Sequence, residues 1–169
     1  MPDLLAPGLH VVFCGTAPGH HSARKGAYYA GPGNRFWPTL HLVGLTPRPL
    51  LPEQALELLA LGLGLTDLVK HRAGSDHELA PEDYDAAALE DRLLAVAPQI
   101  VAFTSKQAAR MALGLRHVAY GCSPDQRFAG AEVHVLTSPS GRATSWWDVA
   151  PWQALAERVR VLQGLGDKA

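Results

Sequence analysis

Three short segments of the chain combine residue types that are suited to holding a small ligand. They are the segments 15–22, 66–70 and 138–142, which read GTAPGHHS, TDLVK and SPSGR. The glycines of the first segment allow its backbone to approach a ligand closely. Backbone N–H groups in such a turn can bind the oxygen atoms of a ligand, or an anion as it leaves. Asp67 adds a carboxylate, which can align a water molecule and stabilise a developing cation. These residue types predict a ligand-binding site with an acidic group.

Each of these segments lies at the end of an apolar run that is typical of a buried strand. Four such runs are expected to form strands, at 10–15, 64–69, 99–104 and 132–136. The runs are mostly continuous rather than alternating, as in parallel strands that are covered on both faces. In an open parallel sheet, ligands bind outside the carboxyl ends of the strands. We therefore expect the three segments to face the same edge of the molecule.

Helical patterns lie between the expected strands. Apolar side chains recur at helical spacing in the ranges 52–61, 82–97, 106–113 and 152–163. Ser105 is expected to cap the third of these helices, and Gly114 is expected to end it. The alternation of strands and helices predicts an α/β fold with three α/β/α layers and a central, mainly parallel sheet of four to five strands. Residues 1–169 are expected to form a single domain.

The composition is that of an ordinary soluble protein. Of the 169 residues, 47% are hydrophobic and 18% are charged, with a formal net charge of −1. No apolar run approaches the roughly 20 residues that a membrane span needs, and the N-terminus lacks the pattern of a signal peptide. Cys14 and Cys122 are too few for a disulfide framework or a four-thiolate iron–sulfur cluster. We expect a cytoplasmic protein with no membrane partner. A local patch around Arg24, Lys25 and Arg35 leaves nucleic-acid binding open.

Four short motifs occur in an order that is similar to that of a known enzyme family. They are Gly–x–x–Pro–Gly at 15–19, Asn–Arg–Phe–Trp at 34–37, Thr–x–Leu–Val at 66–69 and Pro–Ser–Gly at 139–141. The chain resembles the uracil-DNA glycosylase superfamily over about residues 4–162, and most closely the mismatch-specific uracil and thymine glycosylases. The resemblance implies a three-layer α/β/α monomer that acts on double-stranded DNA containing uracil or a related damaged pyrimidine. It implies no metal and no organic cofactor.

The resemblance also implies roles for individual residues. Tyr29 takes the place of an aromatic residue that stacks on the flipped pyrimidine, although the adjacent Tyr28 could exchange with it. Phe36 and Trp37 are expected to pack in the core, after Asn34 as a helix cap. The residues expected to bind the base are Thr16, Ala17, Pro18, Gly19, Ser22 and Tyr29. The residues expected to contact DNA are Ser138, Pro139, Ser140, Gly141 and Arg142.

The sequence departs from the family pattern at the residue that normally positions the attacking water. The mismatch-specific branch has an asparagine there, whereas this chain has Ala17, and Thr16 stands where another branch has a glutamate. In the last segment, Ser138 and Arg142 replace the usual asparagine or histidine and an apolar wedge. An arginine can stack by its guanidinium plane and can pair with a phosphate or an orphaned guanine.

Asp67 is the acidic residue that lies within a strand-end motif, and we predict that it is catalytic. Its charge would stabilise the oxocarbenium character of the sugar but would repel the departing uracil anion. It helps only if it lies nearer to the sugar than to the base carbonyls. Two other roles stay open, namely recognition of the uracil N3–H and a structural hydrogen bond. His20 and His21 could assist the leaving oxygen, although adjacent loop histidines are more often surface residues.

The expected activity is that of a monofunctional DNA N-glycosylase, which flips a base out of the duplex and leaves an abasic site. A G:U mismatch is expected to be a better substrate than an A:U pair because the wobble pair is easier to open. The alternative is a non-catalytic protein that binds uracil-containing or abasic DNA, and Ala17 supports it. An esterase that uses Ser140 is not expected, because the G-x-S-x-G elbow is missing. The sequence has no HxxxH-like spacing, so no metal site is expected.

Overall fold

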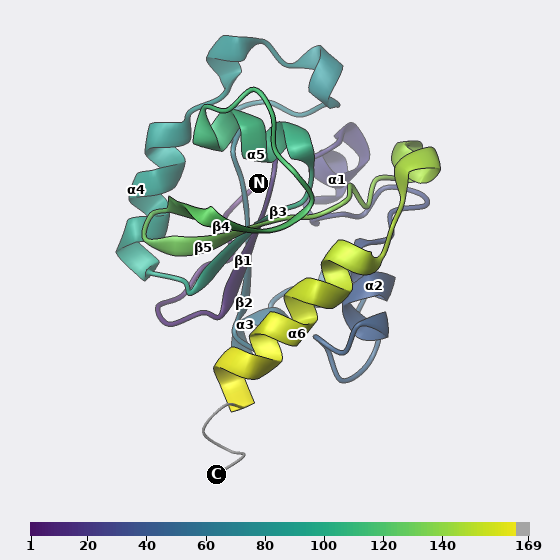
Figure 1. Cartoon of the computed structure of the whole chain (residues 1–169). Helices are drawn as coiled ribbons and strands as arrows, with labels where there is room; N and C mark the ends of the chain where they lie inside the picture. The colour runs from purple at the N-terminus through teal and green to yellow at the C-terminus, as the bar shows by residue number, and fades with distance from the viewer. Residues whose placement is uncertain (165–169) are drawn as a thin grey trace.

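The computed structural model of the chain describes residues 1–164 and has a five-stranded sheet at its centre (Figure 1). The strands are β1 (Val11–Gly15), β2 (Leu63–Asp67), β3 (Ile100–Phe103), β4 (Gly121–Phe128) and β5 (Ala131–Val135). They lie in the order β2-β1-β3-β5-β4, and β2, β1, β3 and β5 run parallel. The four predicted strands are confirmed, with slightly different bounds, and their carboxyl ends meet at one edge of the molecule.

β4 is an additional strand that was not predicted. It pairs with β5 in antiparallel orientation at the edge of the sheet, and its register shifts between Ser123 and Arg127. Most of its residues are exposed or half-buried, so it lacks the apolar run that marks the parallel strands. Pro124 lies at the irregularity, which suits an edge strand because proline has no N–H to donate. Ala129 and Gly130, both with positive φ, form the turn to β5.

Helices cover both faces of the sheet, so the predicted three-layer α/β/α fold is confirmed. Among residues 1–164, no helix combines the length and the apolar character needed to span a bilayer. The helices are α1 (His20–Lys25), α2 (Phe36–Leu42), α3 (Glu57–Ala60), α4 (Ala86–Val96), α5 (Lys106–Leu113) and α6 (Ala150–Gly164). Four 3-10 turns are η1 (Pro52–Gln54), η2 (Asp76–Glu78), η3 (Pro81–Asp83) and η4 (Gly141–Trp146).

The ends of the helices follow from local capping. Ser105 Oγ accepts a backbone N–H at the start of α5, and Gly114 ends that helix with a φ of +67°, as predicted. The predicted helix 82–97 is shorter than expected, because Asp85 caps α4 and the residues before it form η3. The predicted helix 52–61 is interrupted and forms η1 and α3 instead.

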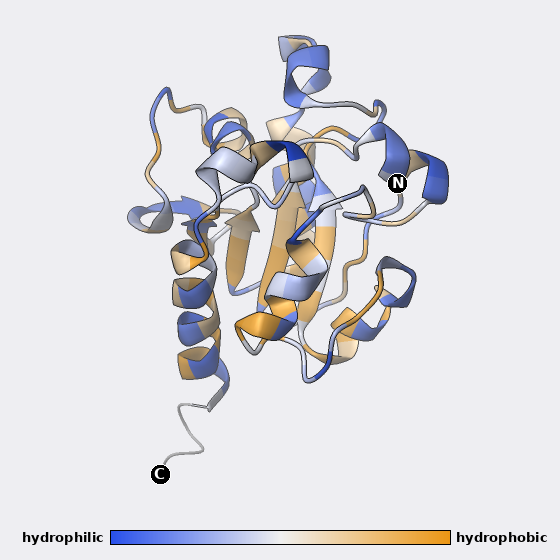
Figure 2. Ribbon diagram, turned by 90° about the vertical axis from the view of Figure 1, so that its right-hand side faces the viewer, coloured by the Kyte–Doolittle hydropathy of each residue, from blue (hydrophilic) through white to orange (hydrophobic). Residues whose placement is uncertain are grey.

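Two apolar layers hold the helices on the sheet. Val12 of β1 packs in the layer that contains α4 and α5, whereas its neighbours Val11 and Phe13 pack in the layer of α2, α3 and α6. All three side chains are fully buried. Figure 2 shows the strands as an orange, hydrophobic centre with hydrophilic loops around it. Because both faces of the strands are covered, apolar residues follow one another without alternation.

The N-terminal segment lies along β2 and covers that edge of the sheet. Leu4 and Leu65 exchange two backbone hydrogen bonds, each 2.9 Å long. This isolated bridge satisfies both outward-facing backbone groups of Leu65 on the edge strand. The same pairing brings Asp3 next to Thr66, whose hydroxyl donates to the Asp3 carboxylate at 2.7 Å. This contact links the first residues of the chain to the carboxyl end of β2.

Candidate active site at the carboxyl edge of the sheet

Three side-chain oxygen atoms converge on Gly15, the last residue of β1. A Cβ atom at this position would lie 3.0 Å from Asp67 Oδ1, 3.3 Å from Thr104 Oγ1 and 3.4 Å from the Tyr29 hydroxyl. The register of the sheet places Asp67 there, because Gly15 and Asp67 are partners at the ends of β1 and β2. Thr104 directly follows β3, the other neighbour of β1. A glycine at this position therefore allows all three oxygens to approach one point.

The Asp67 carboxyl is buried and lacks a full set of partners. Only 3% of the residue is exposed, and its Oδ2 atom has no hydrogen-bond partner within residues 1–164. Burial raises the pKa of Asp67 from its ordinary value of 3.8 to about 7, with Lys70 opposing the increase and Asp3 adding to it. Buried polar atoms usually have a partner, and strongly perturbed acids concentrate at functional sites. Asp67 is therefore the strongest catalytic candidate.

A group of charged residues lies behind Asp67 on the β2 edge. Asp3 accepts a hydrogen bond from Lys70 Nζ at 2.6 Å, and its second carboxylate oxygen is 3.0 Å from Arg92 Nε. Arg92 also donates through Nη2 to the backbone carbonyl of Asp67 at 2.9 Å. Both cations are thus paired with Asp3, and neither forms an ion pair with the Asp67 carboxylate in the described part of the chain. Burial therefore dominates the pKa of Asp67: Lys70 and Arg92 lower this pKa and Asp3 raises it, but none of them outweighs the loss of water around the carboxyl.

Tyr29 places an aromatic ring beside this carboxyl. Its hydroxyl shares a hydrogen bond of 3.2 Å with Thr104, and its ring stacks on Phe36 with 4.0 Å between centroids and 14° between planes. Burial, and then the Asp67 charge, raise the pKa of the phenol, so it stays protonated at neutral pH. The φ of Tyr29 is +53°, a conformation that bulky residues rarely adopt. Such strain concentrates at functional sites.

The residues around Tyr29 have structural roles. Tyr28 is buried and donates its hydroxyl hydrogen bond to the Pro2 carbonyl at 2.8 Å, so the ring beside Asp67 is that of Tyr29. Phe36 and Trp37 are buried in the core, as predicted. The predicted capping by Asn34 is also found, because Asn34 Oδ1 accepts the Phe36 N–H at 2.9 Å, although α2 begins two residues later than Asn34.

The loop after β1 is held by two other segments. The Thr16 carbonyl accepts the Val69 N–H at 2.7 Å, and the Pro18 carbonyl accepts the Gly74 N–H at 2.9 Å. The Thr16 hydroxyl donates to the Asp76 carboxylate at 2.7 Å. These bonds fix the backbone of the loop next to the end of β2.

Two amides of this loop are available to a ligand. The N–H groups of Ala17 and Gly19 donate to no other residue in the described range. Ser22, by contrast, is engaged: it is buried, and its Oγ accepts the Ala30 N–H at 2.9 Å. Ser22 therefore fixes the chain directly after Tyr29. Its expected contact with the base stays a prediction.

The other titratable groups lie away from Asp67. His20 pairs with Glu78 at the surface, with 3.1 Å between Nε2 and Oε2, and His21 is half-buried. Most acids outside the motifs are exposed, as expected. Asp83 is an exception: it is buried, accepts the Ala80 N–H and lies 3.2 Å from a histidine nitrogen. Hydrogen bonds, chiefly the one from the Ala80 N–H, lower the pKa of Asp83. Asp83 is therefore a structural carboxylate.

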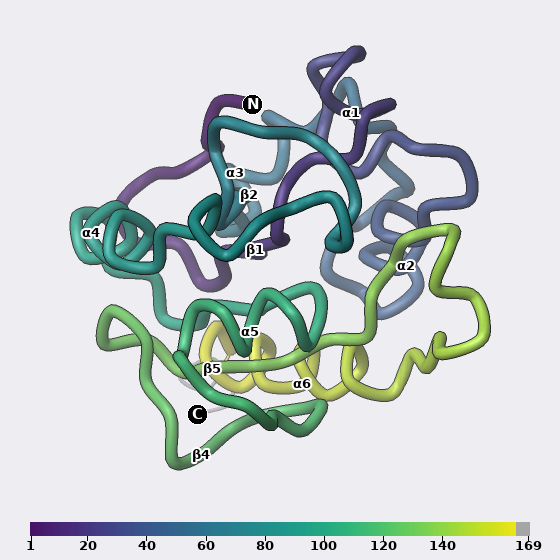
Figure 3. Tube along the Cα trace, turned by 90° about the horizontal axis from the view of Figure 1, so that it is seen from above, coloured from purple at the N-terminus to yellow at the C-terminus, as the bar shows by residue number. Residues whose placement is uncertain are grey.

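The segment 138–142 follows β5 and packs against the chain that leads into α2. The Pro139 carbonyl accepts the Arg35 N–H at 2.8 Å. A Cβ atom on Gly141 would lie only 2.6 Å from the Pro32 carbonyl oxygen, so Gly141 is needed for the close approach of the two backbones. In Figure 3 this segment runs along the right-hand side, next to the chain that enters α2. The predicted segments therefore meet at one edge of the molecule, linked by the chain between α1 and α2.

η4 presents exposed side chains next to this contact. Ser138 Oγ accepts the Ser140 N–H at 3.3 Å, and Ser140 Oγ accepts the Arg142 N–H at 3.2 Å, so both serines shape the turn. The Arg142 side chain is exposed, and 78% of Trp146 is exposed. The turn thus carries one cationic and one aromatic side chain on its surface.

Three residues of this edge were not predicted. The sequence pattern places Thr104 at the end of the strand 99–104, and a polar residue where a buried parallel strand ends is itself a signal of a site. Asp76 bonds to Thr16 across 60 residues of sequence, and no local pattern links the two. Trp146 could have been noticed as a tryptophan in a polar turn shortly after Arg142.

Comparisons with known proteins agree with this arrangement. The family model described as the uracil DNA glycosylase superfamily matches residues 2–161. A solution NMR structure from Methanosarcina acetivorans, of a protein provisionally described as a uracil DNA glycosylase, is similar with a TM-score of 0.68 and 23% sequence identity. The match covers 95% of this chain and 96% of that chain. The structural match shows the fold, and the family match extends over nearly the whole chain.

Asp67→Asn should stabilise the protein more at about pH 8 than at about pH 4.5. The folded pKa of about 7 exceeds the ordinary value of 3.8, so the folded state of the parent protein binds an extra proton between these two pH values. Its free energy of unfolding therefore falls as the pH rises from about 4 to about 7, by up to ~4 kcal/mol. The neutral amide of the variant avoids this loss. Urea unfolding at both pH values measures the difference.

Asp91→Asn is the matched control, because Asp91 is exposed on α4. Its difference from the parent protein should be the same at both pH values. If the stabilisation by Asp67→Asn does not grow with pH, the Asp67 carboxyl is not protonated in the folded state near neutral pH.

Proposed function

We propose that this chain, which belongs to the uracil DNA glycosylase superfamily, removes uracil from DNA by hydrolysing the N-glycosidic bond. One observation carries the proposal: the Asp67 carboxyl is buried, has an oxygen without a partner in the described residues, and lies beside Gly15 and Tyr29. A water molecule and a flipped nucleotide would supply the missing contacts. We further propose that the enzyme is of the mismatch-specific type and acts as a monomer on double-stranded DNA.

The substrate base must leave the duplex before Asp67 can act on it. Swinging a base out of the stack requires a few kcal/mol, and less for a mispaired base. In the proposed complex the uracil stacks on Tyr29, and stacking on an aromatic ring contributes roughly 1–3 kcal/mol per base. Phe36 supports the other face of that ring, and Thr104 holds its hydroxyl. A ring that is already held loses little conformational freedom on binding.

The loop after β1 is proposed to bind the oxygens of the uracil. The amides of Ala17 and Gly19 have no partner in the described residues and follow the strand that ends beside Asp67. Negative charge grows on the uracil as the bond breaks, and N–H groups fixed in advance stabilise it without reorganising. The bonds from Val69 and Gly74 provide that fixation.

Asp67, as a carboxylate, is proposed to align the attacking water. Water attacks C1′ of the deoxyribose, the bond between C1′ and uracil N1 breaks, and its electron pair leaves with the base. The proton of the water passes to the Asp67 carboxylate, whose charge also stabilises the cationic sugar. A pKa of about 7 suits a group that takes up a proton at neutral pH.

The position of Asp67 addresses the repulsion between its charge and the uracil anion. Asp67 is the last residue of β2, whereas the proposed N–H donors Ala17 and Gly19 belong to the loop after β1. The Asp67 carboxylate can therefore lie at the end of β2, close to the sugar, while the uracil is bound by the loop after β1. This separation reduces the repulsion between the carboxylate and the departing uracil anion. Ala17 cannot hold a water molecule with its side chain, which leaves that task to Asp67.

The segment 138–142 and the adjoining turn η4 are proposed to contact DNA. Arg142 is exposed and can bind a phosphate, or the guanine that loses its partner. Trp146 offers an exposed ring on which a base can stack. The Arg35 guanidinium lies 5.2 Å from the Trp147 ring centre, and its Nη1 has no hydrogen-bond partner within residues 1–164. Two arginines, Arg35 and Arg142, thus lie at this edge, although the whole chain has a net charge of −1.

A second candidate function is non-catalytic binding of uracil-containing or abasic DNA. Ala17 favours it, because the asparagine expected from the mismatch-specific branch is missing. Binding without release of free uracil by the parent protein would support this function over catalysis.

Asp67→Asn should lower the single-turnover rate of uracil release by roughly 10²- to 10⁴-fold, the usual contribution of a general base. The rate of the parent protein should rise with pH through about 7, as the carboxylate forms. The variant keeps an oxygen that can accept the uracil N3–H, so a recognition role would change the rate much less. Asp91→Asn serves as the control and should match the parent protein. An unchanged rate for Asp67→Asn would leave Asp67 with a structural role.

Uracil opposite guanine should be released faster than uracil opposite adenine, because less energy is needed to open the wobble pair. Two duplexes of the same sequence that differ only in the opposing base give the comparison, with alkaline cleavage of the abasic product as the readout. Equal rates would contradict the mismatch-specific assignment but leave the glycosylase proposal intact.

Arg142→Ala should weaken the binding of uracil-containing duplexes and reduce the slope of log Kd against log salt by about 1, as expected for one lost phosphate contact. Arg160→Ala is the control, because it removes the same charge near the far end of α6 (Figure 1). Fluorescence anisotropy at several salt concentrations measures both variants. An equal effect of the two substitutions would show that segment 138–142 makes no specific contact.

A further inference from the structure

Three residues of metal-binding type lie together at the other edge of the sheet. Cys122 of β4 and His134 of β5 are register partners, and Glu132 precedes His134 by two residues on the same strand. Side chains of register partners on adjacent strands, and side chains two residues apart on one strand, project from the same face of a sheet. One ligand atom from each of the three lies within 4.8 Å of the others. This face is the one that α6 covers, since Arg158 of α6 pairs with Glu132.

The histidine of this cluster has no hydrogen-bond partner among residues 1–164. Only 1% of His134 is exposed, and neither of its ring nitrogens is hydrogen-bonded within residues 1–164. Its Nε2 lies 3.6 Å from Glu132 Oε1, which is too long for a hydrogen bond. A neutral imidazole has one donor and one lone pair, and burying both without partners is unfavourable. A cation bound between His134 and its neighbours would accept that lone pair.

We propose that Cys122, Glu132 and His134 bind a Zn²⁺ ion, with water as the fourth ligand. Thiolate, imidazole and carboxylate are the protein ligands that zinc prefers. A tetrahedral zinc ion would hold these ligand atoms roughly 3.3–3.6 Å apart. His134 Nε2 and Glu132 Oε1 are already 3.6 Å apart. The other separations are at most 4.8 Å, so they need to shorten by at most about 1 Å, which small side-chain rotations supply. An open cavity of about 220 Å³, lined by Cys122 and Glu132 among others, gives the ion access.

Arg158 competes with the ion for Glu132. Its Nη2 is 2.6 Å from Glu132 Oε2 and its Nε is 3.0 Å from Oε1, so both carboxylate oxygens are engaged. Zinc binding requires at least one of these oxygens. The Arg158 side chain is 41% exposed and can turn toward solvent. Arg158 is therefore expected to reduce the affinity for zinc rather than to prevent binding.

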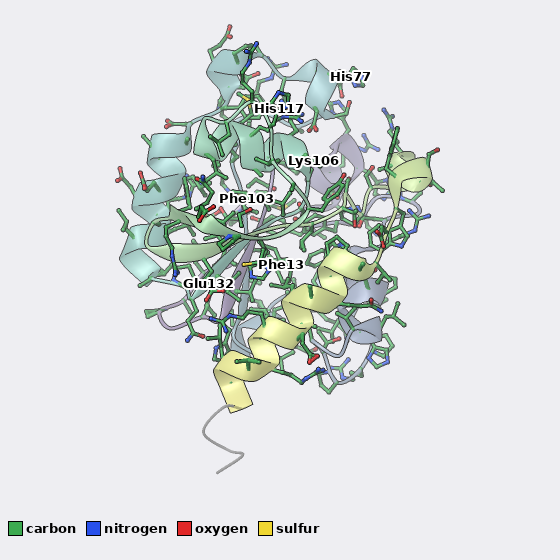
Figure 4. The ribbon with its side chains drawn as sticks, in the orientation of Figure 1. Phe13, His77, Phe103, Lys106, His117 and Glu132 are labelled. Carbon is green, nitrogen blue, oxygen red and sulfur yellow. The ribbon has the colours of Figure 1, made fainter. Side chains whose placement is uncertain are left out.

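The proposed zinc site is separate from the candidate active site. β4 and β2 occupy opposite ends of the strand order. In Figure 4, Glu132 lies far from His77 of η2, the turn whose Asp76 holds the loop after β1. Zinc at Cys122 and His134 would join β4 to β5 next to the register shift that begins at Ser123. Its expected effect is to stabilise this hairpin, whether or not the chain releases uracil.

Titration of the reduced, full-length protein with Co²⁺ tests the proposal, because a cobalt–thiolate bond gives a charge-transfer band in the near ultraviolet. One equivalent should produce this band together with visible bands of tetrahedral cobalt, and Zn²⁺ should abolish both. Cys122→Ser should remove the charge-transfer band and weaken zinc binding at least tenfold. Arg158→Gln should tighten zinc binding several-fold. His117→Gln, which alters an exposed histidine in the α5–β4 loop, is the control and should bind like the parent protein.

Zinc should also raise the thermal unfolding midpoint of the parent protein but not that of Cys122→Ser. No charge-transfer band in the parent protein, or an equal band in Cys122→Ser, would overturn the proposal. Weaker zinc binding by Arg158→Gln would contradict the competition. None of these measurements depends on uracil release, so they are independent of the proposed glycosylase activity.

Discussion

The burial of one carboxyl group at the ends of β1 and β2 is the constraint on which the rest of the site depends. Parallel pairing in register places Asp67 beside Gly15, and the missing side chain of Gly15 leaves room for the oxygens of Asp67, Thr104 and Tyr29. Removing water from the carboxyl favours its protonated form, and its pKa rises to about 7. The two apolar layers on either side of the sheet stabilise the fold enough to hold this unfavourable arrangement.

The charges around Asp67 are arranged so that its carboxylate is not neutralised. The N-terminal segment pairs with β2 and brings Asp3 to Lys70 and Arg92, and both cations form ion pairs with Asp3. The backbone N–H groups of Arg35 and Arg142 bond to Pro139 and Ser140 in the segment after β5, which places both arginines beside that segment. In the proposed complex, these arginines would attract the phosphate backbone of DNA, while Asp67 would align the attacking water.

The sequence by itself determined the fold class and the identity of the main candidates. Strands that are covered on both faces must be continuous apolar runs, so all four parallel strands were visible. Caps act within one turn of helix, so Ser105 and Gly114 marked the ends of α5. The order of four motifs predicted the superfamily, which the family match confirms. The same motifs directed attention to Asp67 and Tyr29.

Only the tertiary structure decided which side chains meet. It brought Thr104 to Gly15 through the pairing of β1 with β3, and Asp76 to Thr16 across 60 residues. It also revealed β4, whose half-exposed residues carry no apolar pattern, and with β4 the pairing of Cys122 with His134. Local interactions leave patterns in the sequence because the residues concerned are neighbours in the chain. The register between distant strands leaves none, because it is set by how the whole core packs.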